Sequence, residues 1–215
     1  MKYIVGIDEV GRGPLAGPLT LCAVRLTVND YIKLKKRKDL PKQGYDSKKL
    51  SQTARKSYSK LLIKLCKDNH GDNKMSSVNT QGAEGGLLHL QFWITDVSNQ
   101  VIDKKGLSFA IKFAVAKCLS KLSAKTDDKV LLDGSLKAPV EFRNQMTIIK
   151  GDEKEKIISW ASILAKVHRD RLMVGFANKY PQYGFEEHKG YGTKKHRQAI
   201  KKYGLSKIHR KSFCG

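Results

Sequence analysis

Short apolar runs that end close to an acidic residue recur along this chain, and they restrict its fold more than any other feature. The runs and their acids are residues 3–7 before Asp8 and Glu9, residues 130–132 before Asp133, and residues 146–149 before Asp152. Aliphatic runs with no polar face are typical of strands that are covered on both sides of a sheet. We therefore predict a buried central strand over residues 3–7, a second strand of the same pattern over residues 130–132 and a further strand over residues 146–149. Each of them brings acidic side chains to its end.

The segments between these strands predict further strands and several helices. Residues 19–28 predict a strand that pairs with the first one as a hairpin, and residues 87–95 predict another strand. Apolar residues at helical spacing predict helices over residues 51–67, 107–122, 155–173 and 193–202. Residues 29–49 are expected to form a solvated basic loop, and residues 68–90 show little periodicity. Strands that alternate with helices indicate an α/β fold, in which ligands gather at the strand ends.

The charge of the chain indicates a polyanionic partner. The 215 residues include 42 Lys and Arg against 20 Asp and Glu, which gives a formal net charge of +22. The 40% share of hydrophobic residues is too high for a disordered polycation, so we expect a folded basic protein. Nucleic acid is the first candidate for its partner and an anionic membrane surface is the weaker alternative.

Several classes of protein are disfavoured by the sequence. We find no stretch of about 18 apolar residues, and acids interrupt the N-terminal apolar run, so we expect neither a membrane span nor a secretory signal. The expected location is therefore the cytoplasm. Its four cysteines form no C-x-x-C pair, which disfavours a zinc site or a disulfide framework.

The four strand-end acids Asp8, Glu9, Asp133 and Asp152 are candidates for a metal site. Carboxylates that are brought together repel one another unless cations intervene, and oxygen ligands suit Mg²⁺ or Mn²⁺. Two such ions about 3.5–4 Å apart can clamp a scissile phosphate. The alternative is that some of these acids, Asp152 in particular, only cap helices or form turns.

Two further segments could contact phosphates. The turn Gly11-Arg12-Gly13 has glycines spaced unlike a dinucleotide-binding fingerprint and lacks the Lys-Ser/Thr of a P-loop, so a nucleotide cofactor is disfavoured. Its glycines would allow a ligand close to the backbone, although an ordinary tight turn explains them equally well. The segment Ser47-Lys48-Lys49 places two ammonium groups before a helix start, where either an anion or solvent would neutralise them.

Taken together, these segments and several others resemble the ribonuclease HII family, and the resemblance covers residues 3–213. The matching blocks occur in the order of the family and are Gly6-Ile7-Asp8-Glu9-Val10-Gly11-Arg12-Gly13-Pro14-Leu15-Ala16-Gly17-Pro18, Asp46-Ser47-Lys48-Lys49-Leu50-Ser51, Leu132-Asp133-Gly134, Lys150-Gly151-Asp152, Ala161-Ser162-Ile163-Leu164-Ala165-Lys166, His188-Lys189-Gly190-Tyr191-Gly192-Thr193 and His209-Arg210-Lys211-Ser212-Phe213.

The resemblance implies a fold and a division of the chain. The fold would be RNase H-like, with a mixed five-stranded sheet flanked by helices and a C-terminal helical lobe. Residues 1–175 would form the catalytic core and residues 176–215 a helical substrate-binding segment, in a protein that we expect to be a monomer. Trp160 stands where the family usually has a small residue, so we expect the helix around it to pack differently.

The resemblance also implies an activity. Asp8, Glu9, Asp133 and Asp152 would be the catalytic, metal-binding carboxylates for Mg²⁺ or Mn²⁺. The enzyme would hydrolyse the RNA strand of RNA–DNA hybrids and would cut 5′ of single ribonucleotides in duplex DNA, leaving 3′-hydroxyl and 5′-phosphate ends. Such cuts would serve the removal of ribonucleotides from DNA.

The remaining implied roles concern substrate recognition. Gly11, Arg12 and Gly13 would read the ribose 2′-hydroxyl, which separates RNA from DNA. Tyr191 would stack on the neighbouring deoxyribose, whereas without its motif it would more often be a packing or surface residue. Ser47, Lys48 and Lys49 are further candidates for substrate binding.

Two alternatives stay open from the sequence. A ribonuclease HIII-like hybrid nuclease would carry similar acids, although Arg12 and the lack of an extra domain before Tyr3 favour HII. A catalytically silent nucleic-acid-binding protein would need only the charge, although the presence of all four acids argues against it. The ending Ser212-Phe213-Cys214-Gly215 has no Q-x-x-L-x-x-F-F pattern, so we expect no recruitment to a sliding clamp.

Overall fold

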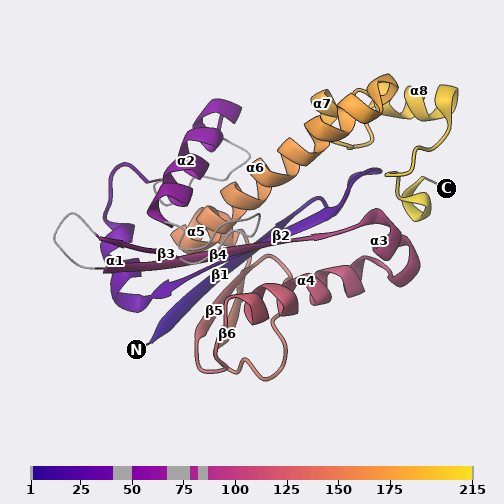
Figure 1. Ribbon diagram of the computed structural model, residues 1–215. Helices are drawn as coiled ribbons and strands as arrows, with labels where there is room; N and C mark the ends of the chain where they lie inside the picture. Colours follow the sequence, from indigo (N-terminus) through magenta and orange to yellow (C-terminus); the bar gives the residue numbers. More distant parts are fainter. Residues whose placement is uncertain (1, 41–49, 67–77, 82–86, 215) are drawn as a thin grey trace.

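A mixed sheet forms the centre of the computed structural model, which describes residues 2–40, 50–66, 78–81 and 87–214 (Figure 1). Its strands are β1 (Tyr3–Val10), β2 (Leu19–Thr27), β3 (Val78–Gln81), β4 (Leu87–Val97), β5 (Lys129–Asp133) and β6 (Gln145–Ile148), in the order β3-β4-β2-β1-β5-β6. β1, β5 and β6 run parallel, whereas β2 pairs antiparallel with both β1 and β4. The expected five-stranded mixed sheet is confirmed, and the short β3 adds a sixth strand at the edge beside β4.

Helices cover both faces of this sheet (Figure 1). On one face lie α1 (Val28–Lys35), α2 (Gln52–Leu65), α5 (Gly151–Lys154) and α6 (Lys156–Lys179), and on the other lie α3 (Asn99–Lys105) and α4 (Leu107–Lys121). The C-terminal part contains η1 (Pro181–Tyr183), α7 (Phe185–His188), α8 (Lys194–Tyr203) and η2 (Lys211–Phe213). Among the described helices, none is both long enough and apolar enough to cross a membrane.

The alternation of side chains along β1 divides the core into two layers. Ile4 packs into the cluster under α1, α2 and α6, whereas Val5 and Ile7 of the same strand pack into the cluster under α3 and α4. Because successive side chains of a strand point to opposite faces, Gly6 and Asp8 share the α6 face with Ile4. The strand pattern therefore directs Asp8 toward α6 at the end of β1.

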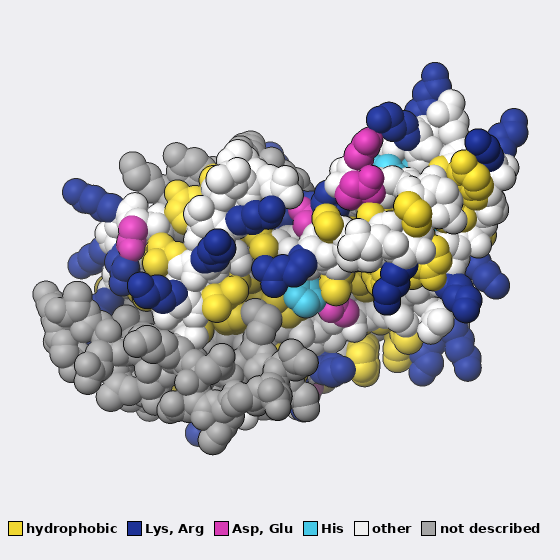
Figure 2. All heavy atoms as spheres, turned by 45° about the horizontal axis from the view of Figure 1, so that its top comes forward, with side chains coloured by type: hydrophobic (Ala, Val, Ile, Leu, Met, Phe, Trp, Pro, Cys, Tyr) yellow, Lys and Arg dark blue, Asp and Glu magenta, His cyan; other side chains and the backbone are white. Residues whose placement is uncertain are grey.

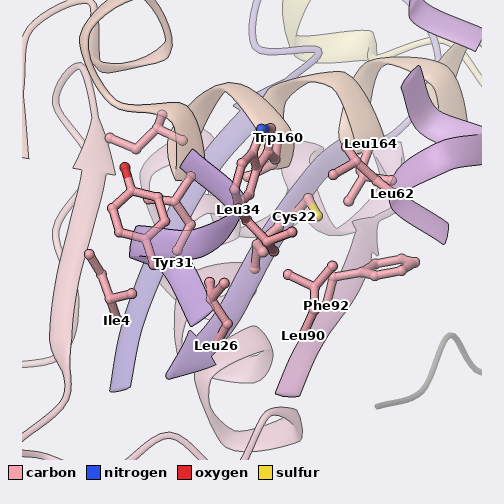
Figure 3. Packing of buried hydrophobic residues seen from close by; sticks show 14 of the residues in the cluster. Ile4, Cys22, Leu26, Tyr31, Leu34, Leu62, Leu90, Phe92, Trp160 and Leu164 are labelled. Atoms are coloured by element: carbon pink, nitrogen blue, oxygen red, sulfur yellow. The ribbon is translucent and has the colours of Figure 1, made fainter. Parts of the chain in front are cut away.

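The expectation of a basic loop over residues 29–49 is wrong for its first part, because α1 occupies Val28–Lys35. Thr27 caps this helix, accepting a hydrogen bond from the Asp30 amide at 3.1 Å. Its apolar side packs on α6, where the Tyr31 ring meets the Trp160 ring edge-on with centroids 5.9 Å apart (Figure 3). Trp160, which stands where the family usually has a small residue, thus packs against α1, a helix that the basic sequence did not predict.

A close contact between β1 and α6 sets the position of the site. A Cβ atom at Gly6 would lie 2.6 Å from the backbone carbon of Ile157, so only glycine lets the helix approach the strand this closely. The expected helix over residues 155–173 begins one residue later and continues to Lys179. The proposed division after residue 175 falls inside α6 and stays a prediction.

The C-terminal part packs against the glycine-rich turn that follows β1. Ala16 of the turn is buried in a small apolar cluster with Met173, Tyr183, Phe185 and Ile208. The main chain joins the two parts as well, because Leu15 donates to the Gly190 carbonyl at 2.8 Å and Gly17 donates to the Ile208 carbonyl at 2.9 Å. The turn and the C-terminal lobe therefore form one packed unit.

Candidate active site

One pocket of about 580 Å³ brings together all the strand-end acids. Its lining also contains the glycine turn, Tyr191 and four residues that were not predicted as site residues, which are Val10, Arg55, Ser162 and Lys166. The lining residues are Asp8, Glu9, Val10, Gly11, Arg12, Gly13, Arg55, Asp133, Asp152, Ser162, Lys166 and Tyr191.

The register of two parallel strands makes Asp8 and Asp133 neighbours. Ile7 of β1 lies opposite Leu132 of β5, so each aspartate is the next residue on its strand. Leu131 packs into the same core layer as Ile4, which places Asp133 on the α6 face together with Asp8. Parallel strands end at one edge of a sheet, and this edge therefore carries both carboxylates.

The turn after β6 brings the third strand's acid to the same edge. Lys150 adopts a left-handed conformation with φ of 54°, which turns the chain from β6 into α5. Gly151 then donates its amide to Asp133 Oδ1 at 2.6 Å, and a Cβ atom at this position would lie 2.7 Å from Ile158 Cδ1. Asp152, the next residue, is nearly buried and faces the pocket.

Glu9 has one satisfied and one unsatisfied carboxylate oxygen. Its Oε1 accepts a hydrogen bond from Arg12 Nη1 at 3.2 Å, and the same nitrogen lies 3.2 Å from Ser135 Oγ. Its Oε2 is buried without a hydrogen-bond partner. A buried acceptor without a donor is costly, and it fits a position that a cation or a substrate group completes.

The electrostatics of the pocket favour the addition of positive charge. Asp8 is only 5% exposed, and burial, followed by the charges of Glu9 and Asp133, raises its pKa well above the ordinary value. Hydrogen bonds from Ser162 and from the Glu9 amide act in the opposite direction. Burial also raises the pKa of Glu9, although Arg12 opposes the shift. A cation between these carboxylates would relieve both the repulsion and the cost of burial.

The donor set of this pocket fits a divalent cation. Among the described residues, no three His, Cys, Asp or Glu side chains converge closely enough to hold an ion as they stand. The pocket nevertheless offers carboxylate oxygens from four residues, one of them unpartnered, and hard cations such as Mg²⁺ and Mn²⁺ take such ligands.

Two fully buried arginines hold the glycine turn by its carbonyl groups. Arg169 of α6 donates to the carbonyls of Pro18 at 3.0 Å, Ala16 at 3.1 Å and Lys189 at 2.9 Å. Arg210 donates to the carbonyls of Gly17 at 3.0 Å, Arg12 at 2.9 Å and Gly11 at 2.6 Å. The turn is therefore preorganised by charge-assisted hydrogen bonds.

The first glycine of this turn cannot be replaced without strain. Gly11 has φ of 92°, a left-handed conformation that side chains disfavour, and a Cβ atom there would run into the Arg169 guanidinium. Gly13, in contrast, has open space around it, and its neighbour Arg12 is exposed. The backbone near Gly13 is thus open to a ligand.

Tyr191 borders the pocket from the C-terminal side. Its side chain is 40% exposed, and the Arg169 guanidinium lies 5.9 Å from the centre of its ring. Arg169 also binds the Lys189 carbonyl, so the same side chain contacts the glycine turn and the loop that carries Tyr191. The two segments expected to read the substrate therefore lie around one pocket.

Of the basic residues that line the pocket, Arg12 was predicted from the sequence, whereas Arg55 and Lys166 were not. Ser47, Lys48 and Lys49 lie outside the described residues. Among the described residues, Arg55 on the first turn of α2 and Lys166 of α6 line the pocket, and Lys166 Nζ lies 2.7 Å from Asp170 Oδ1. Arg55 carries no sequence signal of its own, because a single cation on a helix usually faces solvent, whereas Lys166 could have been found as the last residue of the matching block over residues 161–166.

Comparison with known proteins agrees with this geometry. The family model described as Ribonuclease HII matches residues 5–215. Ribonuclease HII of Clostridium beijerinckii is 41% identical over 212 residues, which are 99% of this chain and 67% of that relative.

Solved structures share the fold. The structure of the PCNA:RNase HII complex from Archaeoglobus fulgidus gives a TM-score of 0.68 at 21% identity, covering 97% of this chain and 94% of that one. Bst-RNase HIII in complex with Mn²⁺ gives a TM-score of 0.63 at 14% identity, covering 99% and 67%. Both relatives support the fold, while the full-length family match distinguishes HII from the HIII alternative. The chain belongs to the ribonuclease HII family, the metal-dependent endoribonucleases that act on RNA–DNA hybrids.

Proposed function

We propose that Asp8, Glu9, Asp133 and Asp152 are the catalytic carboxylates of this enzyme and hold Mg²⁺ or Mn²⁺. We further propose that it cuts on the 5′ side of a ribonucleotide, either in a hybrid or alone in duplex DNA, and leaves 3′-hydroxyl and 5′-phosphate ends. The observation that carries this proposal is that four acids from three strand ends share one pocket with the glycine turn and Tyr191.

The carboxylates prepare the pocket for hydrolysis. Two bound divalent cations would supply an activated water and stabilise the charge that develops on the leaving 3′ oxygen. Asp8 lies at the centre of the acidic group, next to Glu9 in sequence and Asp133 across the sheet, and is therefore our candidate to contact both ions. The Gly151 amide orients Asp133, and Arg12 orients Glu9.

The glycine turn would recognise the ribose. Arg169 and Arg210 bind the carbonyls on its buried side, which leaves the exposed backbone near Gly13 to approach the sugar. A 2′-hydroxyl can donate to a carbonyl and accept from an amide, and a deoxyribose can do neither. With a deoxyribose in this place, the polar groups of the rigid turn would stay unpaired. The turn would therefore discriminate against DNA.

Tyr191 would pack on the deoxyribose next to the cut, because its exposed ring borders the same pocket. Arg55 and Lys166, together with Ser47, Lys48 and Lys49 before α2, would contact the phosphates of the duplex. These contacts are independent of sequence, so the enzyme would select a sugar and not a base.

We also propose that the enzyme acts as a monomer in the cytoplasm without recruitment to a sliding clamp. What supports the last point is that Phe213 packs against the α3–α4 core layer, with the Arg210 guanidinium 5.1 Å from its ring centre. The Ser212 amide and hydroxyl bind Asp103, which holds this segment on the body of the protein.

A duplex with a single ribonucleotide tests the proposed function. The purified protein is incubated with this duplex and with an all-DNA duplex in Mg²⁺, in Mn²⁺ and in chelator, and the product ends are mapped. We expect one cut 5′ of the ribonucleotide, only with metal, and no cut in DNA. Binding without cleavage in either metal would instead support the silent nucleic-acid-binding alternative.

A further inference from the structure

A buried group of three histidines lies directly behind Tyr191. His196 of α8 and His209 are fully buried, and His188 closes α7 just before the Tyr191 loop. The His188 and His196 rings stack with centroids 4.3 Å apart, and the His196 and His209 Nε2 atoms are 3.0 Å apart. None of these side chains lines the pocket, so the proposed mechanism leaves their arrangement unexplained.

The neighbours of His209 determine which of its nitrogens carries the proton. Its Nδ1 lies 2.8 Å from the Ser206 amide, which can only donate, so Nδ1 accepts. A neutral imidazole has one donor and one acceptor, so the proton of His209 is on Nε2. Nε2 therefore donates to His196.

The neighbours of His196 are consistent with this direction. Its Nδ1 lies 2.9 Å from the Tyr191 carbonyl, which can only accept, so Nδ1 carries the proton and Nε2 accepts from His209. A hydrogen-bond chain thus runs from the Ser206 amide through His209 and His196 to the Tyr191 carbonyl. Each bond in this chain requires the preceding one to point the same way.

His188 fixes the same loop one residue earlier. Its Nδ1 accepts from the Gly190 amide at 3.1 Å, so its Nε2 donates to the Tyr183 carbonyl at 2.7 Å. The loop is therefore bound at the Gly190 amide and at the Tyr191 carbonyl by two stacked neutral rings. An aliphatic pair of the same volume would fill this space but could not orient the peptide.

We propose that His196 and His209 are positioning residues, which orient the Tyr191 peptide through this chain and so set the preference for an RNA–DNA junction over a long hybrid. This inference rests on the proposed role of Tyr191 in packing on the junction deoxyribose. Their rings act through the backbone and never touch the substrate. Loss of the chain would leave the carboxylates intact and would impair only junction selection.

The chain also requires every ring to stay neutral. A proton on His196 Nε2 would face the Nε2–H of His209, and the two donors would repel each other. Four groups face the His196 ring: His188 stacked on it, His209 at its Nε2, Phe185 edge-on and Arg197 beside it in α8. No carboxylate is among them, and burial outweighs the Tyr191 carbonyl, which is the group at this ring that favours an imidazolium.

A spectroscopic measurement on the wild-type protein tests the chain directly. Long-range ¹H–¹⁵N NMR at pH 7 distinguishes the two tautomers and the imidazolium of each histidine. We expect His209 with its proton on Nε2 and His196 with its proton on Nδ1. The opposite tautomer in either ring, or an imidazolium, would overturn the proposed chain whatever the enzyme's activity.

Variants then test the consequence for specificity. His196→Phe removes both hydrogen bonds, whereas His196→Asn keeps a donor for the Tyr191 carbonyl. His168→Asn is the matched control, on a half-buried histidine of α6 that pairs with Asp96. We expect His196→Phe to lower kcat/KM on a single-ribonucleotide duplex about tenfold relative to a long hybrid, on the order of the loss of one stacked contact. His196→Asn should restore most of this ratio, and the control should leave it unchanged.

The ratio of the two activities is independent of the fraction of folded enzyme, so a loss of stability alone would not change it. Tyr191→Ala is measured in parallel to separate the two proposals. If Tyr191→Ala changes the ratio and His196→Phe does not, the positioning role is wrong and the proposed function stands. If neither variant changes the ratio, both the role of Tyr191 and the specificity that we derive from the histidines are wrong.

Discussion

Tyr191 is the single side chain on which junction recognition most depends. Its ring is 40% exposed at the edge of the pocket, and its backbone is fixed by His196. We expect Tyr191→Ala to lower cleavage of a single-ribonucleotide duplex by roughly ten- to a hundredfold, because one stacked contact is worth about 1–3 kcal/mol. A long RNA–DNA hybrid should lose less, and an equal loss on both substrates, measured as kcat/KM, would contradict the proposed role.

Buried histidines also predict how stability depends on pH. Burial, with the nearby His188, His209 and Arg197, lowers the pKa of His196 from 6.5 to about 4. Between these values the unfolded chain binds a proton that the folded protein does not, so the free energy of unfolding falls as the pH falls from about 6.5 to about 4. The loss should approach 1.4 kcal/mol per pH unit for this residue.

Urea unfolding from pH 7 to pH 4 measures this dependence. Other groups titrate in the same range, so the matched comparison is His196→Asn, whose side chain cannot take up the proton. We expect the slope of stability against pH to be smaller in the variant than in the wild type. Equal slopes would mean that His196 titrates normally in the folded protein.

The sequence reveals some of these residues and hides others. Asp8 and Asp133 could be predicted because each ends an apolar strand, where a charged side chain has no role in the core. Arg169 and Arg210 could not be assigned a role, because their six hydrogen bonds go to carbonyls of the glycine turn and the Tyr191 loop. Every residue has a backbone carbonyl, so the sequence cannot show which carbonyls accept these hydrogen bonds. Only the fold identifies them.

The contact between β1 and α6 is the element-level feature that carries the site. Gly6→Ala would place a methyl group 2.6 Å from the Ile157 backbone, which cannot move without shifting the helix. We expect a loss of stability of about 1–3 kcal/mol, the usual cost of overpacking, and a loss of activity because Ser162 moves relative to Asp8.

A glycine of α6 itself gives the matched control. Gly175 of α6 is exposed, and a Cβ atom there would meet nothing within 4 Å. Gly175→Ala should therefore stabilise the protein by about 0.5–1 kcal/mol through helix propensity. Urea denaturation compares the two variants, and a Gly6→Ala protein as stable as the wild type would contradict the tight contact.

Helices and strands whose apolar residues repeat at a regular spacing could be predicted from the sequence. A short helix that is stabilised mainly by packing against other elements could not. The helix α4 follows its apolar spacing, and β1 and β2 pair as a hairpin as expected. The helix α1 was missed because its lysines suggested solvent, although Tyr31 and Leu34 on its other side are buried. Three to four apolar residues over two helical turns suffice to bury one side of a helix, and such a short stripe is easily overlooked in a basic segment.

At the scale of the whole molecule, the surface charge should dominate binding. The formal charge is +22, and Figure 2 shows Lys and Arg side chains spread over the visible face with few acids among them. Each neutralised phosphate releases condensed counterions, so the affinity for duplex should fall at least tens-fold between low and physiological salt. A change of less than about threefold in a fluorescence-anisotropy titration would show that the basic surface is not the binding face.

In the proposed function, the basic surface binds the duplex and the acidic pocket cleaves it. Burial, followed by the charges of Glu9 and Asp133, already raises the pKa of the Asp8 carboxyl. Neutralising Asp8 removes this unfavourable buried charge, so the fold should be as stable as before or more so. Duplex binding, which depends on Lys and Arg, should also persist. Asp127→Asn, on an exposed acid in the turn before β5, is the matched control.

The most direct test is single-turnover cleavage of a single-ribonucleotide duplex by Asp8→Asn in Mg²⁺ and in Mn²⁺, with the Kd for the duplex and the melting temperature measured on the same sample. We predict at least about a thousandfold slower cleavage, on the order of 4 kcal/mol in the barrier, with the Kd within about threefold of the wild type and no loss of thermal stability. The control should cleave normally. Near-normal cleavage by Asp8→Asn would contradict the assignment of the pocket as the catalytic site.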